Sequence, residues 1–488
     1  MSPRSEVGSQ PAGSTAPDPA AAAELISTLI ARNAELQELV VSQASRIAEL
    51  ERRLGLNSGN SGKPPSSDGL KKQPRRTQSL RMRSGKKPGG QPGHPGKTLR
   101  QVTDPDAAIE HFPNTCAGCG GALEAGASEG FTARQVFDLP KPQPLEVIEH
   151  RAHVCRCGKC GEQTRADFPT NVAAPVQYGE RLEAYVLYLL YGQLLPEKRV
   201  AALIADLFGV ALSTATLATI GQKAAARLRP FAEAVREHVA QAPVKHMDET
   251  GFRIAGKTQW LHVASTLLLT FYRVSSRRGS LLSGVSGIVV HDHWKPYYTM
   301  EGVLHALCNA HHLRELQALV EIEKEGWARK MQRLLRHACH AANLANGSAL
   351  KPSLIALIER RYEAILAEGF AYHAALPPLA APAKQAKRRG RVPHRTGHNL
   401  LFRLRGRRQD VLRFIHDPSV PFTNNLAEQD GRMMKVKQKV SGGFRSEDGA
   451  EDFSIIRTLI STARKQAWNL LQALTNDIAA LIGQLRFA

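Results

Sequence analysis

The stretch VKHMDETGF, residues 244–252, is followed closely by TQWLHVASTLLLTFYRVSS, residues 258–276. Both are rich in β-branched and aromatic residues broken by short turns, so together they predict three consecutive β-strands. GIVVHDHW, residues 287–294, predicts a fourth, buried strand. Asp248 is expected to end the first strand and Asp292 the fourth. If these two strands are neighbours in one sheet, both carboxylates come within reach of the same cations.

A third carboxylate lies far downstream, in PFTNNLAEQDGRMMKVKQKV, residues 421–440. This segment begins with residues that commonly cap helices and continues with helical periodicity. Glu428 lies in its first turns, and Arg432 and Lys435 share the same helical face. A carboxylate on a helix packed over two strand aspartates can hold two divalent cations for in-line displacement at phosphorus. Oxygen ligands suit Mg²⁺ or Mn²⁺.

The cysteine pattern predicts a second kind of metal site. The chain has seven cysteines, and an odd number in CxxC spacings is typical of metal ligands in a reducing compartment. Cys116 and Cys119 form one CxxC pair and Cys157 and Cys160 form another, each followed by glycine. Four thiolates predict a closed, structural Zn²⁺ site. Cys155 is an alternative to Cys157, and the spacing alone does not choose between them.

The positive charge is concentrated in two segments. The chain has 65 Lys and Arg against 44 Asp and Glu, for a net charge of +21. Residues 57–100 hold eleven basic residues and one acid, and residues 384–408 hold ten basic residues and no acid. Both segments are expected to follow a DNA backbone, with solvated linker or loop as the alternative. The residues expected to contact DNA there are Lys71, Lys72, Arg75, Arg76, Arg388 and Arg389.

The N-terminal part predicts self-association. Residues 1–23 are expected to be disordered, whereas residues 24–56 repeat apolar residues at coiled-coil spacing, with Asn33 at a core position. Such an asparagine fixes register and favours a dimer. The alternative is a lone amphipathic helix packed on the body. No secretory signal is recognisable, and the longest apolar run, residues 184–195, is too short to span a bilayer. We therefore expect a cytoplasmic, nucleoid-associated protein without a membrane partner.

Several strings together resemble a known family. HMDETGF, VVHDHW, CNAHHLREL and FTNNLAEQDGRMMKVKQKVSGGFRS, preceded by the zipper, an LGLNSGNSGKPPSSDG linker and a CxxC pair, resemble the transposases of bacterial insertion-sequence family sixty-six. The resemblance extends from about Leu25 to Leu470. It implies a retroviral-integrase-like (RNase H-like) core with the catalytic triad Asp248, Asp292 and Glu428. It also implies Mg²⁺-dependent strand cleavage and transfer at terminal inverted repeats, target DNA as a substrate, and accessory proteins of the same element.

The expected fold class is therefore a multidomain α+β protein. The catalytic core is expected at 241–312 and 416–488, the latter with C-terminal helices, around a helical insertion at 313–415 that carries the basic segment. Residues 369–398 of the insertion are expected to be loop-like. The remaining parts are a basic flexible linker at 57–105, a zinc-binding domain at 106–172 and a helical, helix-turn-helix-like domain at 173–240.

Other residues near these motifs have less specific roles. Arg314 and Arg445 are expected to contact DNA together with Arg432 and Lys435, and Lys435 matches the basic residue that the family places seven positions after the glutamate. Glu249 is expected to be structural. The residues Cys308, His311 and His312 are expected to lie partly in the core, with metal binding as the alternative. Trp294, Tyr297 and Tyr298 are expected in the core or the wall of the site, with stacking on an unpaired base as the alternative.

Two other functions fit parts of the same sequence. A zinc-containing, dimeric DNA-binding regulator without catalysis would explain the chain before residue 243 but not the three spaced carboxylates. A nuclease of the same fold that hydrolyses without joining would share those carboxylates.

Overall fold

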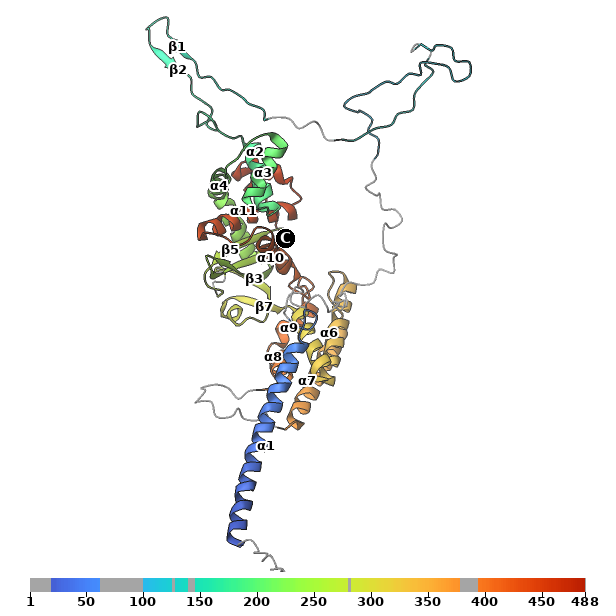
Figure 1. Ribbon diagram of the computed structural model, residues 1–488, viewed down its shortest axis with the longest axis vertical. Helices are drawn as coiled ribbons and strands as arrows, with labels where there is room; N and C mark the ends of the chain where they lie inside the picture. The colour runs from blue at the N-terminus through green and yellow to red at the C-terminus, as the bar shows by residue number, and fades with distance from the viewer. Residues whose placement is uncertain are drawn as a thin grey trace, which may run out of the picture.

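The computed structural model describes residues 19–61, 100–124, 128–138, 145–279, 282–377 and 394–487. In this part of the chain, a five-stranded mixed sheet lies within the body and helices pack around it (Figure 1). The strands of this sheet are β3 (Val244–Ile254), β4 (Lys257–Ser265), β5 (Thr270–Ser275), β6 (Gly287–His291) and β7 (Val303–Leu307). Their order across the sheet is β5-β4-β3-β6-β7.

The strands expected from the sequence are β3 to β6, and β3 and β6 are neighbours as expected. The pairs β3–β4 and β4–β5 are antiparallel, whereas β3–β6 and β6–β7 are parallel. Ala255 and Gly256 join β3 to β4 with φ angles of 46° and 81°, as a tight hairpin of this twist requires. This hairpin extends β3 to Ile254, so Asp248 lies in the middle of the strand and the prediction that it ends the strand is wrong.

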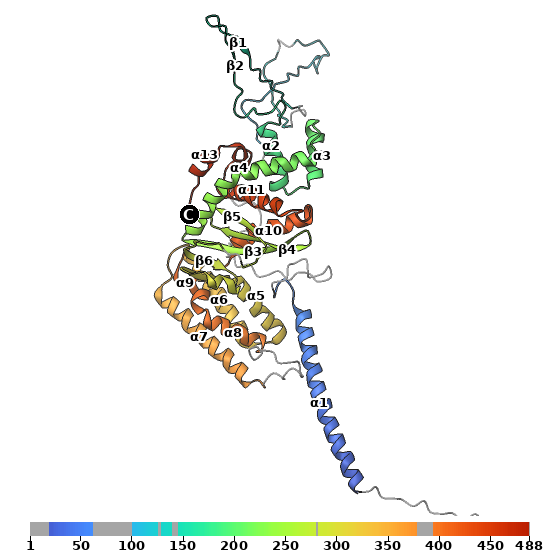
Figure 2. The same ribbon diagram turned by 90° about the vertical axis from the view of Figure 1, so that its left-hand side faces the viewer.

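One face of the sheet is covered by two long helices, α4 (Thr214–Gln241) and α11 (Glu447–Lys465) (Figure 2). Met247 of β3 and Ala264 of β4 belong to the same buried cluster as the apolar residues of these helices. Further helices around this cluster are α2 (Glu180–Leu187), η3 (Tyr188–Gly192), α3 (Glu197–Phe208), α12 (Leu470–Thr475) and α13 (Ile478–Gly483). One hydrophobic core therefore contains residues from both sides of residue 240, where the sequence predicts the boundary between the helical domain and the catalytic core.

Helices α3 and α4 have the helix-turn-helix shape expected from the sequence. Gly209 ends α3 in the left-handed conformation, with φ of 67°, which glycine adopts without strain. Ser213 caps α4, because its hydroxyl accepts a hydrogen bond of 3.0 Å from the amide of Thr216. Most of α4 is nevertheless occupied by packing on the sheet and α11, since residues from Leu217 to Ala240 are buried along it.

Helix α11 also protects the edge of the sheet at β5. The hydroxyl of Thr462 accepts a hydrogen bond from the amide of Thr270, and that of Thr458 accepts one from the amide of Tyr272, both at 3.2 Å. An edge strand would otherwise expose these amides to pairing with another chain. Two threonines one helical turn apart therefore accept the hydrogen bonds of two outward-facing amides of β5.

The opposite face of the sheet packs against α10 (Asn425–Val440). Phe252 and Val263 point to this face, because side chains alternate along a strand and Met247 and Ala264 point to the other. They contact a cluster that includes Met434 of α10. The helix that carries Glu428 is thus placed directly over β3 and β4.

Helices between β7 and α10 form a second core against β6 and β7. They are α5 (Asn309–Ala318), η5 (Leu319–Glu323), α6 (Gly326–Ala345), α7 (Pro352–Ala375), α8 (Thr396–Gly406) and α9 (Arg408–His416). A short helix η4 (Lys295–Thr299) follows β6. Helix α7 continues to Ala375, so the expectation of loop from residue 369 is wrong; buried Gly369 and His373 pack this last part against the core.

The N-terminal helix α1 (Pro19–Gly55) extends away from the body (Figure 2). Its apolar residues are exposed, for example Leu36 by 49% and Ile47 by 56%. Its C-terminal end is attached to the second core, because the side-chain amide of Asn60 donates a 3.0 Å hydrogen bond to Glu321. The helix covers most of the expected segment 24–56 but begins at Pro19, so residues 19–23, expected to be disordered, are helical. The coiled coil remains a prediction. Among the described residues, no helix is both long and apolar enough to cross a membrane.

Candidate active site

Asp248 lies on β3, and Asp292 directly follows the neighbouring strand β6. The parallel ladder of β3 and β6 ends where His246 faces Val290, and each aspartate lies two residues beyond that end. Asp292 accepts a 3.0 Å hydrogen bond from the amide of Trp294. The sequence prediction of neighbouring strand aspartates thus agrees with the geometry.

Glu428 reaches the same region from the first turn of α10, which Asn424 holds against β3. The Asn424 side-chain amide donates to the carbonyl of Met247 at 2.7 Å, and its oxygen lies 2.9 Å from Nδ1 of His246. Asn424 occupies the N-cap position but makes no side-chain cap within its own helix. Its side chain instead joins the helix to the strand, which corrects the expectation of simple capping.

The three carboxylates act on one another electrostatically. Burial, together with the negative charges of Glu249, Glu428 and Asp292, raises the pKa of Asp248 to about 8. Burial also raises the pKa of Asp292, against the opposing charge of Arg278. Excess negative charge therefore gathers at one point between β3, β6 and α10.

Arg278 is a cation already beside this cluster, and no sequence pattern pointed to it. Its guanidinium lies 3.3 Å from Glu249 and 3.9 Å from Asp292. It is also stacked on two indole rings, at 4.1 Å from the centre of Trp294 and 5.0 Å from that of Trp260. Arg278 follows β5 in a turn, so its approach to the carboxylates depends on the tertiary fold.

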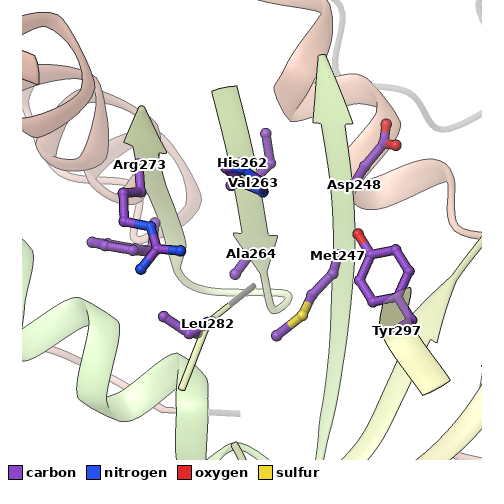
Figure 3. A pocket seen from close by; sticks show the side chains of 9 residues that line it. Met247, Asp248, His262, Val263, Ala264, Arg273, Leu282 and Tyr297 are labelled. Carbon is purple, nitrogen blue, oxygen red and sulfur yellow. The ribbon is translucent and has the colours of Figure 1, made fainter. Parts of the chain in front are cut away.

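Glu249 lies beside the cluster with its side chain only 1% exposed. One of its oxygens, Oε1, is buried and has no hydrogen-bond partner in the described part of the chain. Tyr297 is fully buried nearby, and burial together with the charge of Glu249 raises its pKa well above the usual value. Figure 3 shows Asp248 and Tyr297 at one side of a largely apolar hollow, with Arg273 at the other. Tyr297 thus forms part of the wall, as expected.

The residues expected to contact DNA are found in different settings. Arg432 and Arg445 are exposed. Lys435 turns back on the protein, because its amine donates a 2.8 Å hydrogen bond to the carbonyl of Gly251. Arg314 is half-buried, and its Nε has no partner among the described residues. The remaining residues of this set, Lys71, Lys72, Arg75, Arg76, Arg388 and Arg389, lie outside the described residues.

The described end of the second basic segment is engaged within the protein. Arg403 pairs with Glu315, Arg405 lies 4.3 Å from the ring centre of Phe370, and Arg407 lies 3.5 Å from that of Tyr298. Arg408 pairs with two glutamates of α7. These arginines are therefore paired or stacked at the surface of the second core, and the expectation that the whole run lies along DNA remains a prediction.

The two CxxC motifs form matching turns. The amide of Cys116 donates to the carbonyl of Gly121 at 2.8 Å, and that of Cys157 donates to Glu162 at the same distance. In each turn the following glycine, Gly120 or Gly161, has φ near +70° to +77°. Cys157 and Cys160 therefore share one turn, whereas Cys155 lies on the strand before it, in the hairpin of β1 (Val154–Arg156) and β2 (Gln163–Arg165).

The structure does not gather the four expected zinc ligands around one point. Within the described ranges, the group of three or more possible ligand atoms that lie close together is formed instead by Cys308, His311 and Glu428. Inside each CxxC turn, hydrogen bonds from backbone amides and the partner thiol lower the pKa of Cys116 and of Cys157. Each turn is thus shaped to hold anionic sulfur on its own.

Asp430 is a further buried carboxylate that sequence reasoning missed. It accepts hydrogen bonds from Ser265 at 2.7 Å, Thr270 at 2.9 Å and Lys465 at 2.7 Å. Its charge is therefore fully matched by the sheet and α11, and its role is to fix α10 in place. Asp430 follows Glu428 by two residues, which places it about 200° further around the helix and on a different face.

Comparisons with known proteins agree with this arrangement. A family model described as "Transposase IS66 family" matches residues 175–452, more than half of the chain, and this range contains all three carboxylates. A model for the "zinc-finger binding domain of transposase IS66" matches residues 113–161, and a "Family of unknown function (DUF6444)" matches residues 9–100.

Two relatives come from Sinorhizobium fredii. The uncharacterized protein y4hP is 24% identical over 396 residues, which cover 72% of this chain and 68% of y4hP. The uncharacterized protein y4jO is 34% identical over 94 residues, which cover 18% of this chain and 29% of y4jO. Because its largest matched region spans both the sheet and the helix that bring the carboxylates together, this chain belongs to the IS66 family of transposases.

Proposed function

We propose that the chain cuts DNA strands at the terminal inverted repeats of an insertion sequence and joins them to target DNA. The observation that carries this proposal is that Asp248 of β3, Asp292 after β6 and Glu428 of α10 lie near one another, where burial and the charges of Glu249, Glu428 and Asp292 together raise the pKa of Asp248. The strand order β5-β4-β3-β6-β7, antiparallel on one side of β3 and parallel on the other, supports an RNase H-like core.

The donor set fits a hard divalent cation such as Mg²⁺ or Mn²⁺. All three candidate ligands are carboxylates, and the neighbouring Glu249 keeps a buried oxygen without a partner in the described residues. Asp248, Asp292 and Glu428 would hold such ions. Bound there, the ions would supply activation of a water or 3′-hydroxyl and stabilisation of the leaving oxygen.

The surrounding side chains would orient the DNA and exclude water. Arg278 already lies against the carboxylates and can contact a phosphate from that position, while Trp294 holds its guanidinium plane. Exposed Arg432 and Arg445 would contact the DNA backbone beside α10. Buried Tyr297 would close the side of the site away from the DNA.

The regions outside the core would bind and align the DNA. We assign a structural Zn²⁺ to Cys116, Cys119, Cys157 and Cys160, and the matched turns support Cys157 over Cys155 as a ligand. Helix α1 would pair with a second copy through its exposed apolar stripe, and Asn33 would set the register. Accessory proteins of the same element would complete the assembly.

The test is to incubate the purified full chain with duplexes that carry the ends of its element and Mg²⁺, then map cut strands and joined products. Asp292→Asn and Glu428→Gln should each lower cleavage by about a thousandfold while the protein stays folded, because a metal ligand contributes several kcal/mol to the transition state. Asp106→Asn, an exposed aspartate, is the matched control.

Three outcomes would contradict the proposal. Binding of end DNA without Mg²⁺-dependent cleavage would indicate a DNA-binding regulator. Cleavage without joining to an added target would indicate a nuclease. Strand transfer retained by Asp292→Asn on a pre-cut end would refute the assignment of this residue.

A further inference from the structure

A second cluster of possible ligands adjoins the carboxylates on the α5 side. Cys308 precedes the first turn of α5 and His311 lies within it, three residues later. Both approach the first turn of α10: Sγ of Cys308 lies 3.7 Å and Nδ1 of His311 lies 4.0 Å from the same oxygen of Glu428, Oε1. In the part of the chain that the structure describes, these three atoms all lie within 4.8 Å of one another.

These separations are close to those between ligands on one metal ion. With metal–sulfur bonds of about 2.3 Å and metal–nitrogen or metal–oxygen bonds of about 2.0–2.1 Å, two ligands of a tetrahedral ion lie about 3.3–3.7 Å apart. The sulfur–oxygen distance of 3.7 Å falls within this range. The nitrogen–oxygen distance of 4.0 Å exceeds the roughly 3.3–3.4 Å between a nitrogen and an oxygen on one tetrahedral ion by about 0.6 Å. By contrast, 4.0 Å is too long for a hydrogen bond between His311 and Glu428.

The sulfur of Cys308 is surrounded by amide donors. The backbone N–H of Asn424 donates to it at 3.1 Å. Burial and the charge of Glu428 raise the pKa of the Cys308 thiol to about 12, and the amides of Asn424, Ala310 and His311 oppose this shift. Such N–H donors stabilise a thiolate, which is the form that binds a metal. The sulfur is therefore held in place from both helices before any ligand arrives.

His311 offers a nitrogen that nothing else uses. Its Nδ1 is buried and has no hydrogen-bond partner in the described residues, although the side chain as a whole is 36% exposed. A buried polar atom without a partner is costly, and a bound cation would remove that cost. The neighbouring His312 is different, because its Nδ1 already lies 3.0 Å from the side-chain oxygen of Asn309.

We infer that Cys308, His311 and Glu428 form an open three-ligand site for a borderline divalent cation such as Zn²⁺ or Co²⁺. Sulfur and imidazole donors select such ions over Mg²⁺. With three protein ligands, the fourth position is left for water or a phosphate oxygen of DNA. This assignment favours the metal-binding alternative for Cys308 and His311 over a place in the core alone.

The shared glutamate couples this site to catalysis. Glu428 cannot serve both ions in the same way, so Zn²⁺ at this site should compete with Mg²⁺-dependent cleavage. This consequence rests on the proposed function, whereas binding of the ion itself does not.

Cobalt titration of the full-length protein tests the site, with Co²⁺ as the probe and thiolate-to-cobalt absorption as the readout. The CxxC cysteines contribute equally in every variant, so the difference between variants isolates Cys308. Wild type should bind about one equivalent of Co²⁺ more than Cys308→Ser or His311→Gln. Removing a residue that only orients a ligand typically weakens metal binding about tenfold or more, and removing a ligand itself should weaken it at least as much. Cys339→Ser, at another buried cysteine of the second core, should bind as wild type does.

Equal cobalt stoichiometry in wild type and folded His311→Gln would overturn the inference. This variant decides the matter if Cys308→Ser fails to fold, because His311 is partly exposed and its loss leaves the core intact. The readout is also independent of cleavage. A wild-type protein that binds the extra cobalt but never cuts DNA would contradict the proposed function and leave the cation site standing.

Discussion

Replacing Asp248 by asparagine should stabilise the metal-free protein, and increasingly so as the pH rises. The buried site and its negative neighbours raise the pKa of Asp248 from 3.8 to about 8. Between these values the folded protein keeps a proton that the unfolded chain has released. Because the folded state binds more protons in this interval, the free energy of unfolding decreases as pH rises toward 8 and then levels off.

The magnitude follows from the width of that interval. A carboxyl that is protonated when folded and ionised when unfolded costs up to about 1.4 kcal/mol of stability per pH unit. Between pH 5 and pH 7, wild type should therefore lose about 2–3 kcal/mol relative to Asp248→Asn, whose amide does not titrate. Glu249 and Asp292, whose pKa values burial also raises, are present in both proteins and largely cancel in the difference.

Urea unfolding in magnesium-free buffer at pH 5, 6, 7 and 8, followed by circular dichroism, measures this difference. Asp106→Asn, at an exposed position, is the control and should differ from wild type by the same amount at every pH. A difference between wild type and Asp248→Asn that stays constant from pH 5 to pH 8 would show that the carboxylates are not close enough, or not buried enough, to hold a proton. The electrostatic part of the proposed site would then be wrong.

Three further predictions concern charge, stability and assembly. Arg278→Gln should lower the Mn²⁺ concentration needed for half-saturation in calorimetry, because in the wild type the arginine competes with the ion for the carboxylates. A higher concentration for the variant would mean that Arg278 helps to hold the carboxylates in place for the ion. Lys465→Met should reduce stability by about 3–5 kcal/mol in urea, because it leaves the charge of Asp430 buried and unpaired, and a change below 1 kcal/mol would show that water already screens this pair. Asn33→Leu should turn a dimer into larger species by light scattering, and a monomeric wild type would exclude the coiled coil.

The strands and the position of the aspartates could be predicted because their signals are local. Alternating β-branched and aromatic residues marked β3 to β6, and adjacency of β3 and β6 was enough to bring Asp248 and Asp292 together. The end of β3 was missed because it depends on a hairpin: pairing with β4 carries the strand beyond Asp248 to Ile254. Helical periodicity likewise placed Glu428 on α10, since that face packs on the sheet.

Contacts made across long sequence separations could not be predicted. Arg278 reaches the carboxylates only because β5 and β6 bring its turn back over the sheet. Asn424 looked like a helix cap, yet its amide bonds to β3, 177 residues away. The arginines of α8 and α9 looked like a DNA-binding run, but their partners, such as Glu315, lie on other helices. Composition shows charge, whereas only the fold shows what neutralises it.

The 28 residues of α4 connect the turn after α3 to the catalytic strand, since β3 begins three residues after α4 ends. At 1.5 Å per residue, the helix holds these two places about 40 Å apart. Along B-form DNA, with about 3.4 Å per base pair, that span corresponds to about 12 base pairs. Because α4 is packed on the sheet along its length, the separation between the α3–α4 turn and the beginning of β3 is fixed, so α4 would act as a ruler between a duplex bound at that turn and the strand that carries Asp248.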